Sequence, residues 1–157
     1  ARQSSTLNDT IPIQEAAYAR AGIKVKFNII SAGYYSTVMN PAKQSDMTNS
    51  GWGADWANAS TVIPELFASF GGFNLSQNTN DPAYKAFEDK VNIAMKTTDR
   101  KKQAEMWKAL DKEAMKNFWV LPTTFGKAQE IWGSGLGGVF FWVPQGNPAY
   151  GKIWVKK

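Results

Sequence analysis

The 157-residue sequence contains no histidine and no cysteine. Without them the chain has no Ser-His-Asp or Cys-His triad, no thiolate zinc site and no redox-active dithiol. It also has no apolar run of the roughly 20 residues that a membrane-spanning helix needs. The longest candidate, LGGVFFWV at 136–143, is short and contains glycines. These absences exclude several large enzyme classes, and no cofactor or metal is expected.

The composition is that of a globular protein with many aromatic residues. Hydrophobic residues make up 43% of the chain and aromatic residues 13%, with seven tryptophans. The formal net charge is +5, which raises the alternative of nucleic-acid binding. However, positive and negative charges alternate through residues 81–116, as in KAFEDK and KALDKEAMK. Such mixing is typical of solvated helix faces, so no nucleic-acid partner is expected.

Helices and strands are expected to alternate along the chain. Residues 9–22 predict a helix with Pro12 near its first turn, and the apolar alternation of 23–30 predicts a strand. Further helices are expected at YYSTVM (34–39), from about Pro64, after a cap at Asp81 and after a cap at Thr98. Further strands are expected at 118–125, at 128–132 and within 151–157. The fold class predicted is α/β, with a mixed sheet flanked by helices.

Two apolar faces are expected on the helices that follow Asp81 and Thr98. Their spacing is that of one helix face packing on a core. The members of the faces are Tyr84, Phe87, Val91 and Ala94 on the first helix, and Ala104, Trp107, Leu110 and Ala114, with Met115 also packed, on the second. Trp142 and Trp154 are expected to pack as well, and Phe125 and Trp132 to lie in the core or at an interface.

The stretch SGWGADWANAS (50–60) places one carboxylate, Asp55, between two indoles, Trp52 and Trp56. A carboxylate partly desolvated by such rings is a strong partner for an ammonium or guanidinium group. Gly53 lets a ligand approach the main chain closely. The alternative is a turn in which Asp55 caps a helix and both tryptophans lie in the core. Both interpretations fit the residues alone.

The chain resembles the family 5 extracellular solute-binding proteins, the oligopeptide- and dipeptide-binding components of ABC importers. The resemblance is carried by SGWGADWANASTVIPELF, which is similar to the family's GW-x-AD-[WY] segment. Other stretches follow the order of the family's C-terminal lobe. They are AGIKV, YYSTVM and Asp46 before this segment, TTDRKKQAEMWKALDKEAMKNFWVLP after it, and AYGKIWVKK at the end of the chain. It covers about residues 13–157. It implies one lobe of a two-lobe, type II periplasmic-binding-protein-like fold.

The resemblance also implies which residues bind ligand. Asp55 would take the α-ammonium group of a peptide, Trp52 would line the pocket, and the main chain of Gly53 and Ala54 would bond to the ligand backbone. Trp56 occupies the position of a family aromatic residue. Asn58 is a further candidate, although Ala57-Asn58-Ala59 departs from the acidic residues and proline of many relatives. Tyr34 and Tyr35 are candidates that follow the expected strand; the alternative for them is the face of an amphipathic helix.

The implied function is capture without chemistry, so no enzyme activity is expected. The implied partners are a peptide or other small ligand, the N-terminal lobe of the same protein, and ABC permease subunits. The chain itself would be a fragment, the C-terminal lobe over 1–157, located outside the cytoplasmic membrane and lipid-anchored if the missing N-terminus carries an anchor. Because the family also takes up nickel chelates and oligosaccharides, these ligands remain alternatives. A two-carboxylate hydrolase using Asp46 and Asp55 is the alternative from another class.

Overall fold

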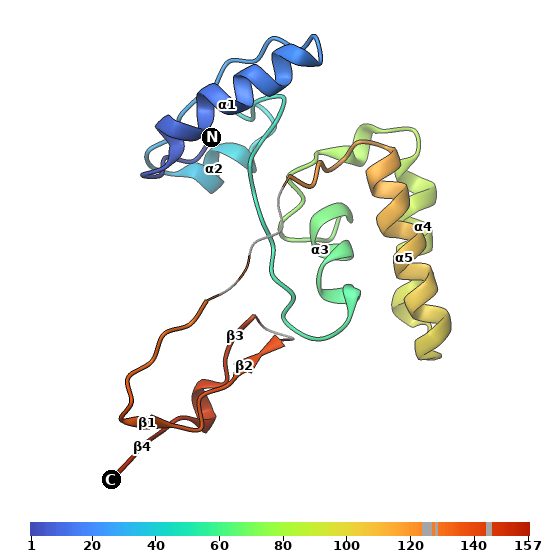
Figure 1. The fold of residues 1–157 in the computed structure, drawn as a ribbon. Helices are drawn as coiled ribbons and strands as arrows, with labels where there is room; N and C mark the ends of the chain where they lie inside the picture. Colours follow the sequence, from blue (N-terminus) through green and yellow to red (C-terminus); the bar gives the residue numbers. More distant parts are fainter. Residues whose placement is uncertain (124–126, 128, 144–145) are drawn as a thin grey trace. The chain divides into compact units, whose positions relative to one another are not determined.

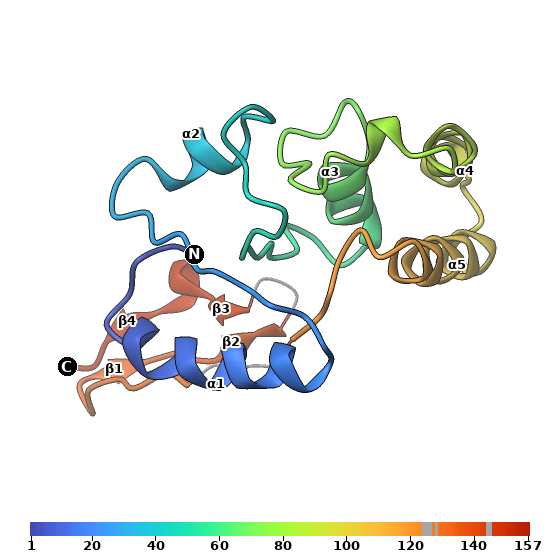
Figure 2. The same ribbon diagram turned by 90° about the horizontal axis from the view of Figure 1, so that it is seen from above.

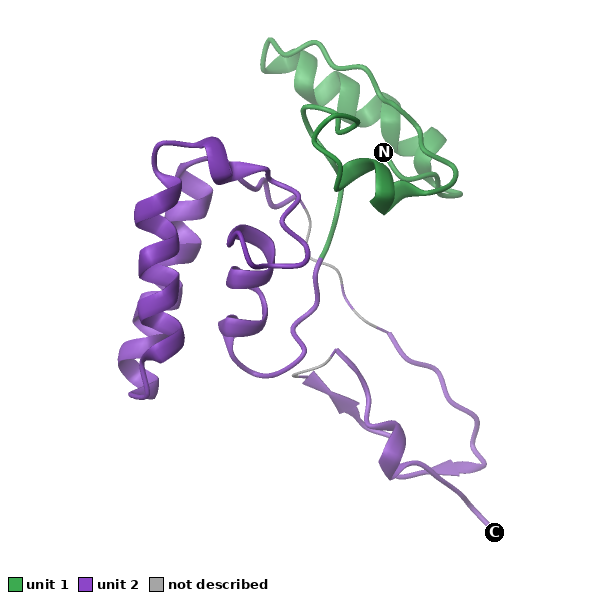
Figure 3. Cartoon of the chain, turned by 180° about the vertical axis from the view of Figure 1, so that it is seen from behind, with its two compact units in different colours: residues 1–51 green, residues 52–157 purple. Residues whose placement is uncertain are grey.

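The computed structural model describes residues 1–123, 127, 129–143 and 146–157 (Figure 1). Contacts within the chain divide it into two compact units, Ala1–Gly51 (unit 1) and Trp52–Lys157 (unit 2), which Figure 3 colours separately. The expectation that residues 1–157 form one lobe stays a prediction.

Unit 1 contains two helices, α1 (Leu7–Arg20) and α2 (Tyr34–Val38), which confirms the helices expected in both places. Helix α1 begins earlier than expected, so Pro12 lies inside it rather than in its first turn. Since proline has no N–H group, the helical hydrogen bond to the carbonyl of Asn8 is missing. Gly22, with φ of 75°, follows the helix as expected of a helix stop. Leu7 is the only buried residue of α1, so most of this helix is in contact with solvent.

The strand expected at 23–30 is not formed. Residues 23–29 have no regular secondary structure, and the only ladder contact of this segment in the described chain is a parallel bridge between Arg2 and Ile30. The backbone N–H of Gln3 donates to the Ile30 carbonyl at 3.1 Å, and the N–H of Ile30 donates to the Ala1 carbonyl at 2.9 Å. An alternating pattern makes a residue run suitable for a sheet, but a strand also needs a partner along its whole edge. The described chain supplies a partner only at Ile30.

Unit 2 begins with a helical part. Its elements are η1 (Ala59–Thr61), α3 (Ile63–Phe67), η2 (Asn78–Asn80), α4 (Tyr84–Lys96) and α5 (Arg100–Lys116). Figure 2 looks nearly along α4 and α5, which lie side by side. Lys90 on α4 forms an ion pair with Glu113 on α5 at 2.7 Å. The alternating charges of this region thus lie on exposed helix faces, as expected.

The caps of α4 and α5 differ from the expected ones by a residue or two. The side chain of Asp99, not of Thr98, accepts hydrogen bonds from the N–H groups of Lys101 and Lys102, at 2.9 and 3.1 Å. Asp81 accepts from the N–H of Ala83 at 2.8 Å, while α4 itself starts after Ala83. Cap geometry depends on one backbone turn, so periodicity fixes it only to within about two residues.

The hydrophobic core lies between α3, α4 and α5. Its buried members are Ile63, Phe67, Phe87, Val91, Ala94, Trp107, Leu110 and Ala114. This confirms the apolar face of α4, and that of α5 with one exception. Ala104 is exposed, and Gln103 occupies that end of the face instead. The Gln103 side-chain amide donates hydrogen bonds to the carbonyls of Ala94 and Thr97, both at 3.0 Å. A polar side chain thus bonds to the backbone carbonyls at the end of α4, where an apolar side chain was expected.

The C-terminal part of unit 2 contains two small antiparallel sheets. Strands β1 (Leu136–Gly137) and β4 (Trp154–Val155) form one, and β2 (Phe141–Trp142) and β3 (Asn147–Pro148) form the other. A short helix, η4 (Tyr150–Lys152), precedes β4. The expected terminal strand is therefore confirmed as β4. The larger mixed sheet of the predicted α/β lobe is not among the described elements, and assignment to a two-lobe fold stays a prediction.

The two strands expected at 118–125 and 128–132 are not formed in the residues described there, 118–123 and 129–132. Pro122 cannot donate to a ladder, and no partner strand lies beside either segment in the described chain. Phe125 lies outside the described residues. Trp132, Trp142 and Trp154 are 52%, 46% and 56% exposed, so the expectation that Trp142 is packed in the interior is wrong. The Trp154 ring lies against the backbone of Gly137 and Gly138, so it packs on β1 while more than half of it stays exposed.

Candidate functional site

The candidate site is the loop that runs from Trp52 to Asn58 and leads into η1. Thr61, the last residue of η1, is only 3% exposed and holds this loop from two sides. Its carbonyl accepts a hydrogen bond from the Trp52 indole N–H at 2.8 Å. Its hydroxyl accepts from the N–H of Asp55 at 3.2 Å and donates to Asp55 Oδ2 at 2.7 Å. The position of Asp55 is therefore fixed by a buried threonine that sequence reasoning did not single out.

Asn58 fixes the same loop at its other end. Its side-chain oxygen accepts from the N–H of Ser60 at 2.9 Å, which makes Asn58 the N-cap of η1. Its amide donates to the side chain of Gln103 on α5 at 2.8 Å. Both polar groups of Asn58 are thus occupied within the protein. The expectation that Asn58 binds ligand is not supported by this geometry, and an asparagine before a short helix is a recognisable cap signal.

The two indoles are not buried. Trp52 is 38% exposed and Trp56 is 54% exposed, so the alternative that both lie in the core is wrong. The Trp56 N–H donates to the Ser60 hydroxyl at 3.0 Å. The Trp52 ring lies against the Phe73 ring, with centroids 5.1 Å apart. Hydrogen bonds to η1 thus hold both rings on the surface of unit 2.

Asp55 as a whole is exposed, and its hydrogen bond with Thr61 is part-buried. One of its oxygens, Oδ2, is held by Thr61, whereas Oδ1 has no hydrogen-bond partner within the described part of the chain. Nor is Asp55 the cap of the following helix, since Asn58 has that role. The carboxylate is oriented by one oxygen and leaves the other available to an outside donor.

A pocket of about 400 Å³ adjoins Asp55. It is lined by Trp52, Gly53, Ala54, Asp55 and, from β3, Asn147. The structure therefore brings together four of the residues predicted from the sequence. The N–H and carbonyl groups of Gly53 and Ala54 make no backbone hydrogen bond within the described residues, and a side chain placed on Gly53 would meet nothing within 4 Å. Asn147 lies far along the chain, and no local sequence signal indicated it.

Tyr34 and Tyr35 belong to unit 1 and line a separate pocket there. Tyr34 is buried, and its hydroxyl donates to the carbonyl of Asn49. Burial raises the pKa of the Tyr34 hydroxyl, and this hydrogen bond lowers it in part. Tyr35 is 41% exposed. Tyr34 thus follows the alternative of a packed helix face, and Tyr35 presents its ring to the pocket of unit 1.

Comparison with protein-family models, with curated proteins and with solved structures found no match to this chain. Within the described residues no group of three or more acidic side chains is placed to hold a metal ion. No helix among those residues is long and apolar enough to cross a membrane.

Proposed function

We propose that this chain is the C-terminal ligand-binding lobe of the substrate-binding component of an ABC importer, and that it captures peptides by their amino end. The observation that carries the proposal is the oxygen Oδ1 of Asp55, which lies at a pocket and has no partner among the described residues, while Oδ2 is held by Thr61. A peptide ammonium group is a matching donor, because hydrogen bonds between ionised groups are among the stronger ones in proteins. The Trp52 ring beside it offers a flat wall for the first side chain.

The main chain of Gly53 and Ala54 would extend the interaction along the peptide backbone. These groups are exposed and make no backbone hydrogen bond in the described chain, so bonds to a ligand would cost no internal ones. Recognition through the ammonium charge and the main chain requires few specific contacts with the ligand side chains. Such a site suits a protein that binds many different peptides. The N-terminal lobe of the same protein would supply the other half of the contacts by closing over the ligand. The complex would then dock on the permease outside the cytoplasmic membrane.

The proposal is tested by titrating the ¹⁵N-labelled chain with trialanine and with N-acetyl-trialanine. We expect trialanine to shift the amide signals of residues 52–56, with a Kd weaker than about 1 µM, because one lobe makes only part of the contacts. N-acetylation removes the positive charge and should abolish the shifts. Asp55→Asn keeps an acceptor for Thr61 but loses the charge, and we expect binding at least about tenfold weaker.

Asp46→Asn is the matched control, because Asp46 is also exposed and its substitution changes the net charge of the protein by the same amount. It should leave binding unchanged. Equal binding of the acetylated peptide, or of an uncharged oligosaccharide by both wild type and Asp55→Asn, would contradict capture through an ammonium group.

A further inference from the structure

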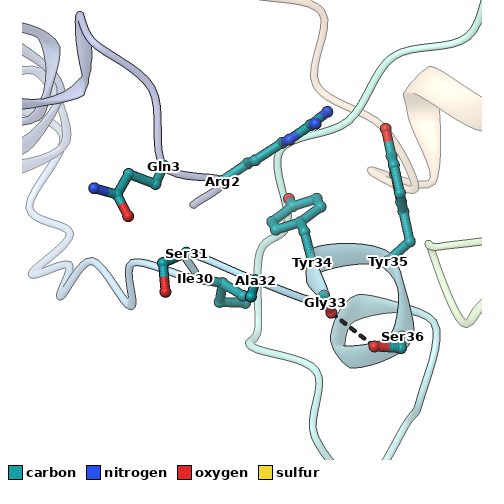
Figure 4. A pocket seen from close by; sticks show the side chains of 9 residues that line it. All are labelled: Arg2, Gln3, Ile30, Ser31, Ala32, Gly33, Tyr34, Tyr35 and Ser36. Atoms are coloured by element: carbon teal, nitrogen blue, oxygen red, sulfur yellow. Dashed lines mark hydrogen bonds between the residues drawn. The ribbon is translucent and has the colours of Figure 1, made fainter.

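Unit 1 contains a second pocket, shown in Figure 4, with a volume of about 420 Å³. Arg2, Gln3, Ile30 and Ser31 line it together with Tyr34 and Tyr35 from α2. This volume lies within the range of pockets that hold small molecules. Among the described residues that line the pocket, Arg2 is the only charged one, so the pocket is positively charged.

Arg2 has no carboxylate partner among the described residues. Its guanidinium carbon lies 5.9 Å from the centroid of the Tyr35 ring. In Figure 4 the Arg2 side chain extends toward the two tyrosine rings. A cation over an aromatic face is held weakly by the ring and keeps its N–H donors free for a ligand. The guanidinium group thus lies beside the Tyr35 ring, and no carboxylate among the described residues pairs with its charge.

The tyrosine wall of this pocket is formed before any ligand arrives. The Tyr34 and Tyr35 rings meet edge to face, with centroids 5.4 Å apart. The buried Tyr34 is fixed by its hydrogen bond to the Asn49 carbonyl. The turn that starts α2 is fixed as well, because Gly33 has φ of 64° and its carbonyl accepts from the hydroxyls of Ser36 and Thr37, at 2.8 and 3.1 Å. A preformed wall lowers the ordering cost of binding.

We infer that the unit 1 pocket binds a small molecule that carries a carboxylate on a flat apolar body. The fork of N–H donors on Arg2 matches the two oxygens of a carboxylate, and the exposed Tyr35 ring covers the body by stacking. Ile30 adds apolar surface, and Ser31 adds a hydroxyl group to the lining of the pocket. This inference does not depend on the role proposed for Asp55, which belongs to unit 2.

The inference is tested by following the ¹⁵N-labelled chain during titration with benzoate, with neutral benzamide and with inorganic phosphate. We expect benzoate to shift the Arg2 side-chain signal and the amide signals of 30–36. Benzamide should bind at least about fivefold more weakly, because it lacks the charge that pairs with Arg2. Phosphate should also be weaker, since it has no flat body to stack on Tyr35.

Two pairs of variants separate recognition from general charge and from folding. Arg2→Gln should reduce benzoate affinity about tenfold, whereas Arg20→Gln, with the same charge change at an exposed position on α1, should not change it. Tyr35→Phe should keep the affinity and Tyr35→Ala should lower it about threefold. Equal binding of benzamide, phosphate binding as tight as benzoate, or an unchanged affinity in Arg2→Gln would overturn the inference.

Discussion

The helical core of unit 2 and the C-terminal part of the same unit differ in how far their aromatic residues are buried. In the helical part, Phe67, Phe87 and Trp107 are 0–6% exposed. In the C-terminal part, Phe140, Phe141 and Trp142 are 39–50% exposed, and Val143, Tyr150, Trp154 and Val155 are 56–77% exposed. The two parts are similarly apolar in sequence, so composition alone does not decide burial.

The difference lies in the length of the helices and strands, which sets how much apolar surface each one presents. Helices α4 and α5 present complete faces along thirteen and seventeen residues, and two such faces cover each other. Each described strand of the C-terminal part is two residues long, and a pair of such short strands offers little apolar surface for a second layer to cover. The free energy of hydrophobic burial is therefore concentrated in the helical part.

The largest expected effect comes from emptying the helical core. Phe87 is fully buried, and its ring meets Trp119 edge to face at 4.9 Å. Phe87→Ala should lower the free energy of unfolding by about 3–5 kcal/mol, because it removes a buried ring and leaves a cavity. Phe141→Ala, at a residue 39% exposed, should lower it by about 0.5 kcal/mol or less. Urea denaturation followed by circular dichroism measures both. Equal losses would mean that the two parts are stabilised alike.

A smaller effect is expected at the start of α5. Asp99→Ala should cost about 1 kcal/mol of unfolding free energy, because two N–H groups lose their acceptor. Thr98→Ala is the neighbouring control and should change stability by about 0.5 kcal/mol or less. Denaturation of both variants tests whether the cap lies where the structure has it. A larger loss at Thr98 would restore the cap expected from the sequence.

The smallest effect concerns pH and the junction of α4 with the preceding loop. Hydrogen bonds from the Ser69 and Tyr84 hydroxyls, both 2.6 Å from Glu88 Oε1, lower the pKa of the Glu88 carboxyl below its usual 4.5. A lowered pKa stabilises the folded state above 4.5, and this stability is lost as pH falls from there through the folded-state pKa.

Glu88→Gln should therefore show a shallower fall in unfolding free energy between about pH 5 and pH 3 than the wild type. Glu105→Gln, at an exposed position of α5, serves as the control and should follow the wild-type curve. An identical pH dependence in all three proteins would show that the hydrogen bonds of Glu88 do not contribute.

The sequence indicated much of the candidate site, but not what holds it. The glycines and the lone carboxylate of residues 51–56 marked the loop, and Trp52, Gly53, Ala54 and Asp55 do line one pocket. Asn58 carried a local cap signal, but nothing in the sequence indicated that Thr61 holds Asp55 or that Asn147 reaches the pocket. These depend on side chains meeting across turns and across long separations, which no local pattern records.

The sequence by itself determined the helices, because a helix satisfies its own backbone and its apolar spacing shows which face is buried. Tyr84, Phe87, Val91 and Ala94 were predicted in this way and are buried. Only the tertiary structure decided the strands, because a strand exists only where a second segment pairs with it. The run at 23–30 has the pattern of a strand, but among the described residues it forms a bridge only at Ile30, whereas Trp154 and Val155 pair with Gly137 and Leu136.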